Sequence, residues 1–402
     1  MLPGGIKRKI ITDMKTIFIF LLLLISKFHY AQSYQKIHTK AIIVDTHNDF
    51  LMRAADIGSV FDQDYTGKGH SDLARMKKGG VDVQIFSVYT DGDQKESYAY
   101  ANREMDSLDA IVARNPGKIV KVLNFKELLQ AVKQNKIAAM FGVEGGHMIE
   151  DDLGKLEALY NRGARYLTLT HNIAPTWATS AADETSGKFL PHKGLTDFGK
   201  IVVKRMNELG MMVDISHAGD QTFWDVIAIT TKPIIASHSS VYTLTPHRRN
   251  LKDEQIKAIA KNGGVIQINF NPGFIDSSFD KKEEAFLKTH SAEMDSLKKA
   301  GMREHYAGDF LYYKYAAEVL SIRPPLSKVI DHIEYIIKLV GVNYVGLGSD
   351  FDGINVTPLQ LDDVTSYHLI TKALLEKGYR KKDITKVLGG NILRVLKANE
   401  KN

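Results

Sequence analysis

Six short polar motifs hold most of the residues that could carry out chemistry, and each directly follows an apolar run. A single histidine or carboxylate at such a place is usually only a hydrogen-bonded turn residue. Several imidazoles and carboxylates that meet at one place, however, would repel one another unless a cation lay among them. Together the motifs therefore indicate a metal site. They are Asp45-Thr46-His47-Asn48-Asp49, Glu144-Gly145-Gly146-His147, Thr170-His171-Asn172, Ser216-His217, Ser237-His238-Ser239-Ser240 and Ser349-Asp350-Phe351-Asp352-Gly353.

The available ligand types narrow the choice of metal. The chain has no cysteine and 14 histidines, so a metal must be held by imidazole, carboxylate or backbone oxygen. Imidazole combined with carboxylate suits zinc or another first-row divalent ion. His47 and Asp49 are two residues apart and can share one ion in extended chain, while His217 and His238 leave neighbouring runs and can share a second. Glu144 has two oxygens that can bridge the ions, and such an arrangement predicts hydrolysis.

The apolar runs before these motifs must position them. Eight runs rich in β-branched residues recur along the chain, and stretches with helical spacing separate most of them. Eight such units are the number that closes a (β/α)8, TIM-like barrel of the α/β class, whose enzymes build their sites at the carboxyl ends of the strands. A doubly wound open sheet is the alternative. The predicted strands are 41–45, 81–88, 137–143, 166–169, 211–215, 234–237, 265–269 and 344–349, and the clearest predicted helices are 153–162, 196–209, 253–261 and 326–339.

Residues 34–402 are expected to form one domain. No linker rich in proline, serine or glycine divides this part of the chain, and no repeat of 20 to 50 residues is visible. One unit departs from the pattern, because residues 271–325 form a long segment with charged helical pieces between the seventh and eighth predicted strands. We expect this segment to be an insertion that forms a lid over the site or a subunit contact.

The first 31 residues have the three-part layout of a secretory signal. Basic residues precede an apolar run of nine residues over 17–25, and a small-residue cleavage region follows near Ala31. This run is too short for a stable transmembrane helix, so no lasting membrane anchor is expected. The segment holds four of the six net positive charges, and no basic block remains to indicate nucleic-acid binding. We expect an exported protein, periplasmic or secreted, whose translation starts at Met1 or Met14.

Taken together, the motifs resemble those of the membrane dipeptidase (renal dipeptidase) family of zinc peptidases, within the amidohydrolase-like barrels. The resemblance extends from about residue 41 to residue 396. Other amidohydrolase barrels generally have His-x-His after the first strand, whereas His47-Asn48-Asp49 is typical of the dipeptidase branch. The matching motifs are 44–49, 79–89, 143–146, 167–172, 214–217, 237–240, 248–250 and 348–353.

The resemblance implies two zinc ions per chain and a homodimer. By similarity, His47, Asp49 and Glu144 bind one ion, and Glu144, His217 and His238 bind the other. A hydroxide held between the two ions would then attack the peptide carbonyl of a dipeptide, including dipeptides with a C-terminal D-residue. The family also opens some β-lactam rings.

The resemblance also implies roles for residues that bind no metal. Asp350 corresponds to the residue that moves the proton and His171 to the histidine that contacts the substrate carbonyl and stabilises the oxyanion. Arg249 corresponds to the arginine that receives the C-terminal carboxylate, and a guanidinium is chemically suited to that role because it binds a carboxylate through two hydrogen bonds. Asn269, at the end of the seventh predicted strand, is a further candidate for substrate binding.

Two alternatives stay open at the level of sequence. Another binuclear metal hydrolase on the same barrel, such as a lactonase, a phosphotriesterase or a cyclic-amide or β-lactam hydrolase, would need the same ligands but no Arg249. A noncatalytic metal-binding or substrate-binding protein would need neither Asp350 nor His171. We assign three further polar residues to structural roles beside the site, namely His147, His247 and Asp352.

Overall fold

Eight parallel strands follow one another around a barrel in the computed structural model, which describes residues 34–401. The barrel is nearly closed, because the amide of Thr46 donates to the carbonyl of Leu347 (3.3 Å) and Asn48 forms a bridge with Phe351. This contact between the first and last strands excludes the open sheet. The strands are β1 (Val44–Asp45), β2 (Val83–Tyr89), β4 (Ile137–Glu144), β5 (Ala164–Thr168), β6 (Met212–Asp214), β7 (Ile235–Ala236), β8 (Val265–Ile268) and β9 (Val345–Leu347), and β3 (Ile119–Lys121) pairs only with β4.

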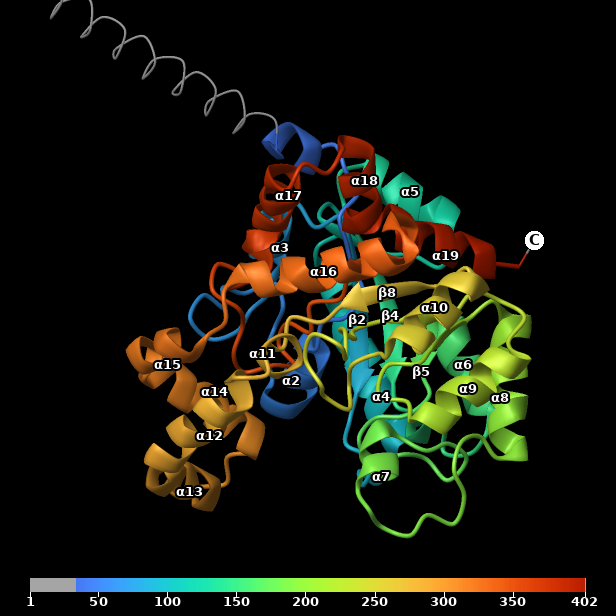
Figure 1. Ribbon diagram of the computed structural model, residues 1–402, viewed down its shortest axis with the longest axis horizontal. Coiled ribbons are helices and arrows are strands. Elements are labelled where there is room, and N and C mark those ends of the chain that lie inside the picture. The colour runs from blue at the N-terminus through green and yellow to red at the C-terminus, as the bar shows by residue number, and fades with distance from the viewer. Residues whose placement is uncertain (1–33, 402) are drawn as a thin grey trace, which may run out of the picture.

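All eight predicted strands are confirmed, although most of the observed strands are shorter than predicted and β5 begins two residues earlier. The four predicted helices are also confirmed, as α6, α8, α10 and α16. The sequence did not predict β3, since three residues are too few to show a period. Figure 1 shows helices packed around the strands. Those of the barrel are α2 (Phe50–Ile57), α3 (Leu73–Lys78), α4 (Ser97–Arg114), α5 (Phe125–Lys133), α6 (Leu153–Arg162), α7 (Ala181–Thr185), α8 (Asp197–Leu209), α9 (Asp220–Ile229), α10 (Asp253–Asn262), α16 (Leu326–Val340), α17 (Tyr367–Glu376), α18 (Lys381–Thr385) and α19 (Asn391–Asn399).

Alternation along the strands decides which side chains enter the barrel. In β4, Ala138 and Met140 belong to the apolar cluster inside the barrel, whereas Ala139 and Phe141 belong to the cluster between strands and helices. Side chains two residues apart point to the same side of a strand, so Glu144 at the end of β4 points into the barrel with Met140. The same rule puts Tyr166 of β5 inside. The barrel therefore has an apolar lower layer and polar side chains at the carboxyl ends of its strands.

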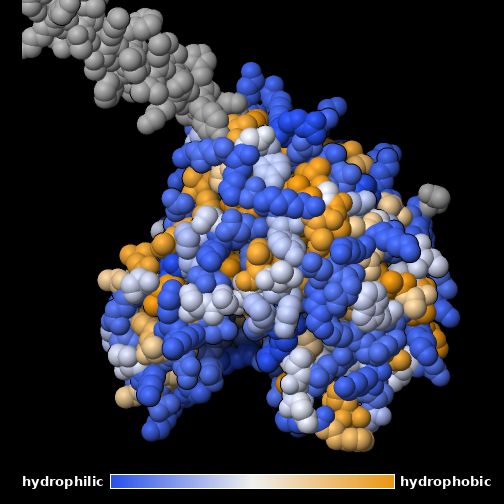
Figure 2. Space-filling model, in the orientation of Figure 1, coloured by the Kyte–Doolittle hydropathy of each residue, from blue (hydrophilic) through white to orange (hydrophobic). Residues whose placement is uncertain are grey.

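Five helices between β8 and β9 form a lobe beside the barrel (Figure 1). The lobe has an apolar cluster of its own, which includes Phe279, Phe286 and Leu311. Figure 2 shows a hollow with a largely hydrophilic surface between this lobe and the loops around α7. These helices are α11 (Pro272–Ile275), α12 (Phe279–Thr289), α13 (Ser291–Lys299), α14 (Glu304–Lys314) and α15 (Ala316–Ile322).

The predicted export signal, residues 1–31, lies outside the described residues. Among the residues that the structure does describe, no helix is both long enough and apolar enough to cross a membrane.

One glycine inside the barrel allows a large side chain to reach the site. A Cβ atom on Gly142 of β4 would lie 1.9 Å from the Cζ atom of Tyr166. We expect Gly142→Ala to lower the free energy of unfolding by roughly 1–3 kcal/mol, because the Tyr166 ring would have to move. Denaturant unfolding measures this change. Gly117→Ala is the matched control, since a Cβ atom there meets nothing within 4 Å, and equal midpoints for both variants would contradict the expectation.

Candidate active site

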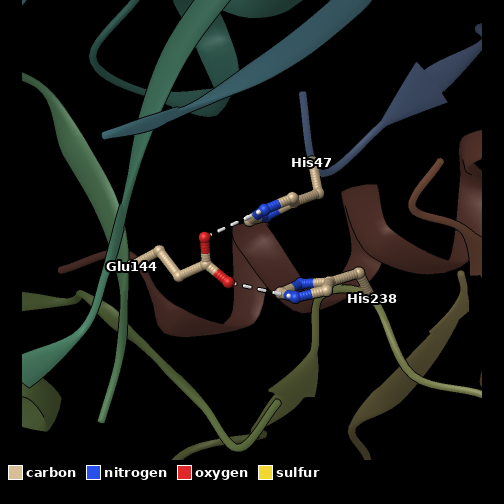
Figure 3. Close-up of side chains that lie close together, drawn as sticks. All are labelled: His47, Glu144 and His238. Atoms are coloured by element: carbon tan, nitrogen blue, oxygen red, sulfur yellow. Dashed lines mark ion pairs between the residues drawn. The ribbon is translucent and has the colours of Figure 1, made fainter. Parts of the chain in front are cut away.

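Three histidines surround the carboxylate of Glu144 at the mouth of the barrel. The Nε2 atom of His47 lies 3.3 Å from Glu144 Oε2, and the Nε2 atoms of His217 and His238 each lie 3.1 Å from Glu144 Oε1. All four side chains are buried. Figure 3 shows His47 and His238 pointing toward the two oxygens of this one carboxylate. Glu144 is thus shared by two groups of possible ligand atoms, one with His47 and His238 and the other with His171 and His217.

Asp49 and Asp350 extend the group around His47. Asp49 Oδ2 lies 3.4 Å from His47 Nε2, and ligand atoms of all three residues lie within 4.8 Å of one another. The other oxygen of Asp49 is buried and has no hydrogen-bond partner among residues 34–401. A Cβ atom on Gly353 would lie 2.1 Å from Asp49 Oδ2 and 2.5 Å from Asp350 Oδ1, so only glycine leaves the space between these carboxylates open. An unpartnered oxygen beside such a space fits a cation ligand.

Hydrogen bonds behind two of the histidines orient their rings. The Tyr166 hydroxyl donates to the carbonyl of Thr46 (3.0 Å), so its oxygen accepts the Nδ1–H of His47 (2.9 Å). The Ser237 hydroxyl donates to Asp214 (2.5 Å) and accepts the Nδ1–H of His238 (2.8 Å). In both histidines Nδ1 therefore carries a proton, and Nε2 faces Glu144. This is how proteins prepare imidazole to bind a metal.

The electrostatics of the cluster also fit a metal. The Nε2 atoms of His217 and His238 are 3.2 Å apart, and both face one carboxylate oxygen. Burial lowers the pKa of both rings well below the usual range. Burial also acts to lower the pKa of His47, but Tyr166, Glu144 and Asp49 raise it well above its usual range. The Nε2 lone pair of His238 and the Glu144 oxygen that it faces need a cation between them in a buried site. Imidazole and carboxylate donors suit zinc or another first-row divalent ion.

Two buried aspartates hold the loops that carry the ligands. Asp45 accepts hydrogen bonds from the amides of His47 (3.2 Å) and Ser349 (2.9 Å), and so joins the ends of β1 and β9. Asp214 accepts in the same way from the amides of Ser216 (3.0 Å) and Ser237 (2.8 Å), and so joins the ends of β6 and β7. Asp45 thus fixes the loops that carry His47 and Asp350, and Asp214 fixes those that carry His217 and His238.

Two of the predicted site residues lie in a backbone conformation that side chains rarely adopt. The φ angle is 64° at His217 and 65° at Asp350. Such left-handed residues cost of order 1–3 kcal/mol and persist only where the surrounding structure holds them. Burial, and then the charge of Asp49, raise the pKa of Asp350 well above its usual range, so this carboxyl group can hold a proton.

A cavity of about 310 Å³ opens above the ligand cluster, and Arg249 forms part of its wall. The guanidinium is buried, donates to the carbonyl of His238 (3.2 Å) and lies 5.4 Å from the centre of the Phe274 ring. Burial lowers the pKa of Arg249 to about 10, which still leaves the group charged at neutral pH. A fixed positive charge therefore faces the cavity, while its neighbour Arg248 is exposed.

His171 lines the cavity, whereas Asn269 does not. The ring of His171 lies between those of Tyr89 and His217, with centroids 4.5 and 4.2 Å away. The amide of Asn269 is buried and donates to Asp350 Oδ2 (2.8 Å). Asn269 thus positions Asp350 from behind, and does not face the space that a substrate would occupy.

The three residues expected to have structural roles lie outside the ligand groups. His147 bonds through Nε2 to the carbonyl of Thr90 (2.9 Å), and His247 Nδ1 accepts from the amide of Arg249 (3.2 Å). Asp352 accepts from the amide of His70 (2.8 Å).

Several residues of the site were not predicted from the sequence. Tyr166 supports His47, and its only sequence signal is a polar atom within an apolar run. Asp91 follows β2 and lines the cavity, and Arg303 and His305 reach it from the lobe. No spacing connects these last two residues to the motifs, because they lie far along the chain in a segment without strands.

Comparison with known proteins agrees with this geometry. The family model of membrane dipeptidases, peptidase family M19, matches residues 31–402. The chain belongs to this family. It is therefore a metallo-dipeptidase, and the resemblance of the motifs is confirmed. An uncharacterized dipeptidase of Schizosaccharomyces pombe is 34% identical to this M19 dipeptidase over 389 residues, which cover 92% of this chain and 83% of the relative.

Solved structures have the same fold as this M19 dipeptidase. The probable dipeptidase PvdM from Pseudomonas aeruginosa is 22% identical with a TM-score of 0.76, and the match covers 92% of this chain and 98% of that one. The family M19 metallopeptidase called dipeptidase AC is 24% identical with a TM-score of 0.73, over 89% and 98% of the two chains. A Rhodobacter sphaeroides metallopeptidase, solved with a phosphinate mimic of the dipeptide L-Ala-D-Ala, is 22% identical with a TM-score of 0.71, over 90% and 100%.

The hydroxyl of Tyr166 offers a test of the ligand geometry. We expect Tyr166→Phe to weaken metal binding by roughly 10- to 100-fold, because it removes the partner that orients His47. Competition with a chromophoric zinc chelator measures the affinity. Tyr160→Phe is the matched control, since the hydroxyl of Tyr160 has no hydrogen-bond partner among residues 34–401. Unchanged affinity in Tyr166→Phe would show that the Nδ1 hydrogen bond does not prepare His47 as a ligand.

Proposed function

We propose that this M19 dipeptidase hydrolyses dipeptides at a centre of two zinc ions that share Glu144. One observation carries the proposal: one oxygen of the Glu144 carboxylate faces His47, and the other faces His217 and His238. His47 and Asp49 would complete one ion site, and His217 and His238 the other. When bound, two such ions would lower the pKa of a water molecule and polarise the peptide carbonyl.

Arg249 would hold the C-terminal carboxylate of the dipeptide. Its guanidinium is buried, charged and directed into the cavity, and a planar guanidinium can pair with a carboxylate through two hydrogen bonds. A fixed charge beside the ligand cluster would place the peptide bond of a short substrate over Glu144. The bond nearest the carboxyl terminus would then be cleaved.

His171 and Asp350 would assist the bond cleavage from two sides of the cavity. Burial lowers the pKa of His171, so the ring is neutral and can donate one hydrogen bond to the carbonyl oxygen as negative charge develops there. Asp350 would take the proton released by the attacking water and deliver it to the leaving amine. The amide of Asn269 would keep the Asp350 carboxyl turned toward the ligands.

Three further parts of the proposal rest on similarity or on the sequence. Cleavage of dipeptides with a C-terminal D-residue is supported by the Rhodobacter sphaeroides relative, whose ligand mimics L-Ala-D-Ala. Export to the periplasm or the medium is supported by the composition of residues 1–31. A homodimer is proposed by family resemblance.

Removal of the metal tests the centre itself. We expect the purified protein to contain about two zinc ions per chain, and chelation to abolish hydrolysis of Ala-Ala and of L-Ala-D-Ala until zinc is added back. His217→Ala should lose one ion and most of the activity. Metal analysis together with a dipeptidase assay measures both effects. Full activity after chelation, or in His217→Ala, would contradict the proposed mechanism.

Arg249 distinguishes a dipeptidase from other binuclear hydrolases. We expect Arg249→Met to lower kcat/KM for Ala-Ala by about 30-fold or more, since truncating one partner of a buried charge pair costs roughly 2–5 kcal/mol. Ala-Ala amide has no carboxylate, so the same variant should change its slower hydrolysis little. Arg248→Met replaces the exposed neighbouring arginine and is the control. An equal loss for both substrates would argue against a carboxylate clamp.

A further inference from the structure

A second arginine, Arg303, lies at the mouth of the cavity, just before the first residue of α14. It donates through Nη1 to Asp56 of α2, and its Nη2 atom lies 3.5 Å from Asp91 Oδ2. Arg303 and Asp91 both line the cavity, and about half of each side chain is exposed. The pair therefore connects the lobe to the loop that follows β2.

Buried contacts hold this arginine in place. Asp56, which accepts from Arg303, also accepts from the hydroxyl of Tyr306 (3.0 Å). Two helices are joined by a buried ion pair, because Arg53 of α2 donates to Asp309 of α14 (2.5 Å). A pair with both partners buried resists separation, since breaking it would leave a charge without a partner. The start of α14 is thus a fixed wall of the cavity.

Asp91 is held on the other side of the pair. The hydroxyl of Tyr89 donates to Asp91 Oδ1 (2.6 Å), and Tyr89 is the last residue of β2. The ring of the same tyrosine contacts His171. The Asp91 carboxylate therefore has a fixed position relative to the reacting centre.

The strand order places this pair across the barrel from Arg249, which is proposed to bind the substrate carboxylate. β2 is the second strand of the barrel and β7 the sixth, so Asp91 and Arg249 follow strands on opposite sides. Glu144 lies at the end of β4, the third strand. A dipeptide with its carboxylate at Arg249 and its peptide bond at Glu144 would point its N-terminal end toward Asp91 and Arg303.

We propose that Arg303 and Asp91 form an end wall that limits the substrate on its N-terminal side. The proposal rests on the proposed function, with the substrate carboxylate at Arg249. A substrate extended beyond its N-terminal residue would have to separate the pair and occupy its place, whereas a dipeptide would end before it. The reaction would be unchanged: water adds to the carbonyl, the C–N bond breaks, and the leaving amine takes the proton.

Two substrates test the end wall. Ala-Ala ends before the wall, and acetyl-Ala-Ala has the same scissile bond and carboxylate but extends farther on the N-terminal side. We expect Arg303→Ala to raise kcat/KM for acetyl-Ala-Ala by about fivefold and to change that for Ala-Ala little. The products, acetyl-Ala and Ala, are identified by mass spectrometry. Lys298→Ala is the matched control, because it also removes an exposed ion pair of the lobe, with Glu304, but Lys298 does not line the cavity.

A second variant and a double variant complete the test. Asp91→Ala should also raise kcat/KM for acetyl-Ala-Ala. The double variant should raise it by less than the product of the two single increases, because both residues belong to one pair. The end-wall proposal would be wrong if neither single variant raised kcat/KM for acetyl-Ala-Ala. It would also be wrong if the variants lowered kcat/KM for Ala-Ala alone. These results are distinct from a failure of the proposed function, in which wild-type protein would not discriminate Ala-Ala from its amide.

Discussion

Five side chains predicted to bind metal converge on one buried space, and the barrel has to hold them there. The cost of burying these lone pairs and negative charges is large unless a cation binds among them. Glu144 is at the centre of this constraint, since its two oxygens are shared between His47 on one side and His217 and His238 on the other. Much of the surrounding hydrogen bonding serves to keep these donors in place.

Similar supporting hydrogen bonds occur at several strand ends around the barrel. Asp45 and Asp214 each accept amide hydrogens from the ends of two adjacent strands. Tyr166 and Ser237 each accept the Nδ1 proton of a histidine that is predicted to bind metal. None of these four residues is a predicted ligand. They are the outer layer of contacts that decides which nitrogen of a histidine is free to bind metal.

The lobe between β8 and β9 adds what the barrel alone lacks, an outer wall to the cavity. The buried pair of Arg53 and Asp309 joins the lobe to α2, the helix that begins directly after Asp49. The wall and a predicted metal ligand are therefore positioned by the same element. Membership of family M19 establishes the type of enzyme, and the residues of this wall are specific contacts through which one member could differ from another.

Local patterns in the chain specify the barrel and the ligand set, whereas the packing of distant segments determines which residues surround them. Strand alternation and the polar residues that follow each strand are local features, so Glu144 and the histidines are recognisable in the sequence. The supporting role of Tyr166, the place of Asn269 behind Asp350, and the arrival of Arg303 at the cavity depend on contacts between segments far apart in the chain. Such contacts exist only once the barrel closes and the lobe packs against it, and no period or spacing in the chain encodes them.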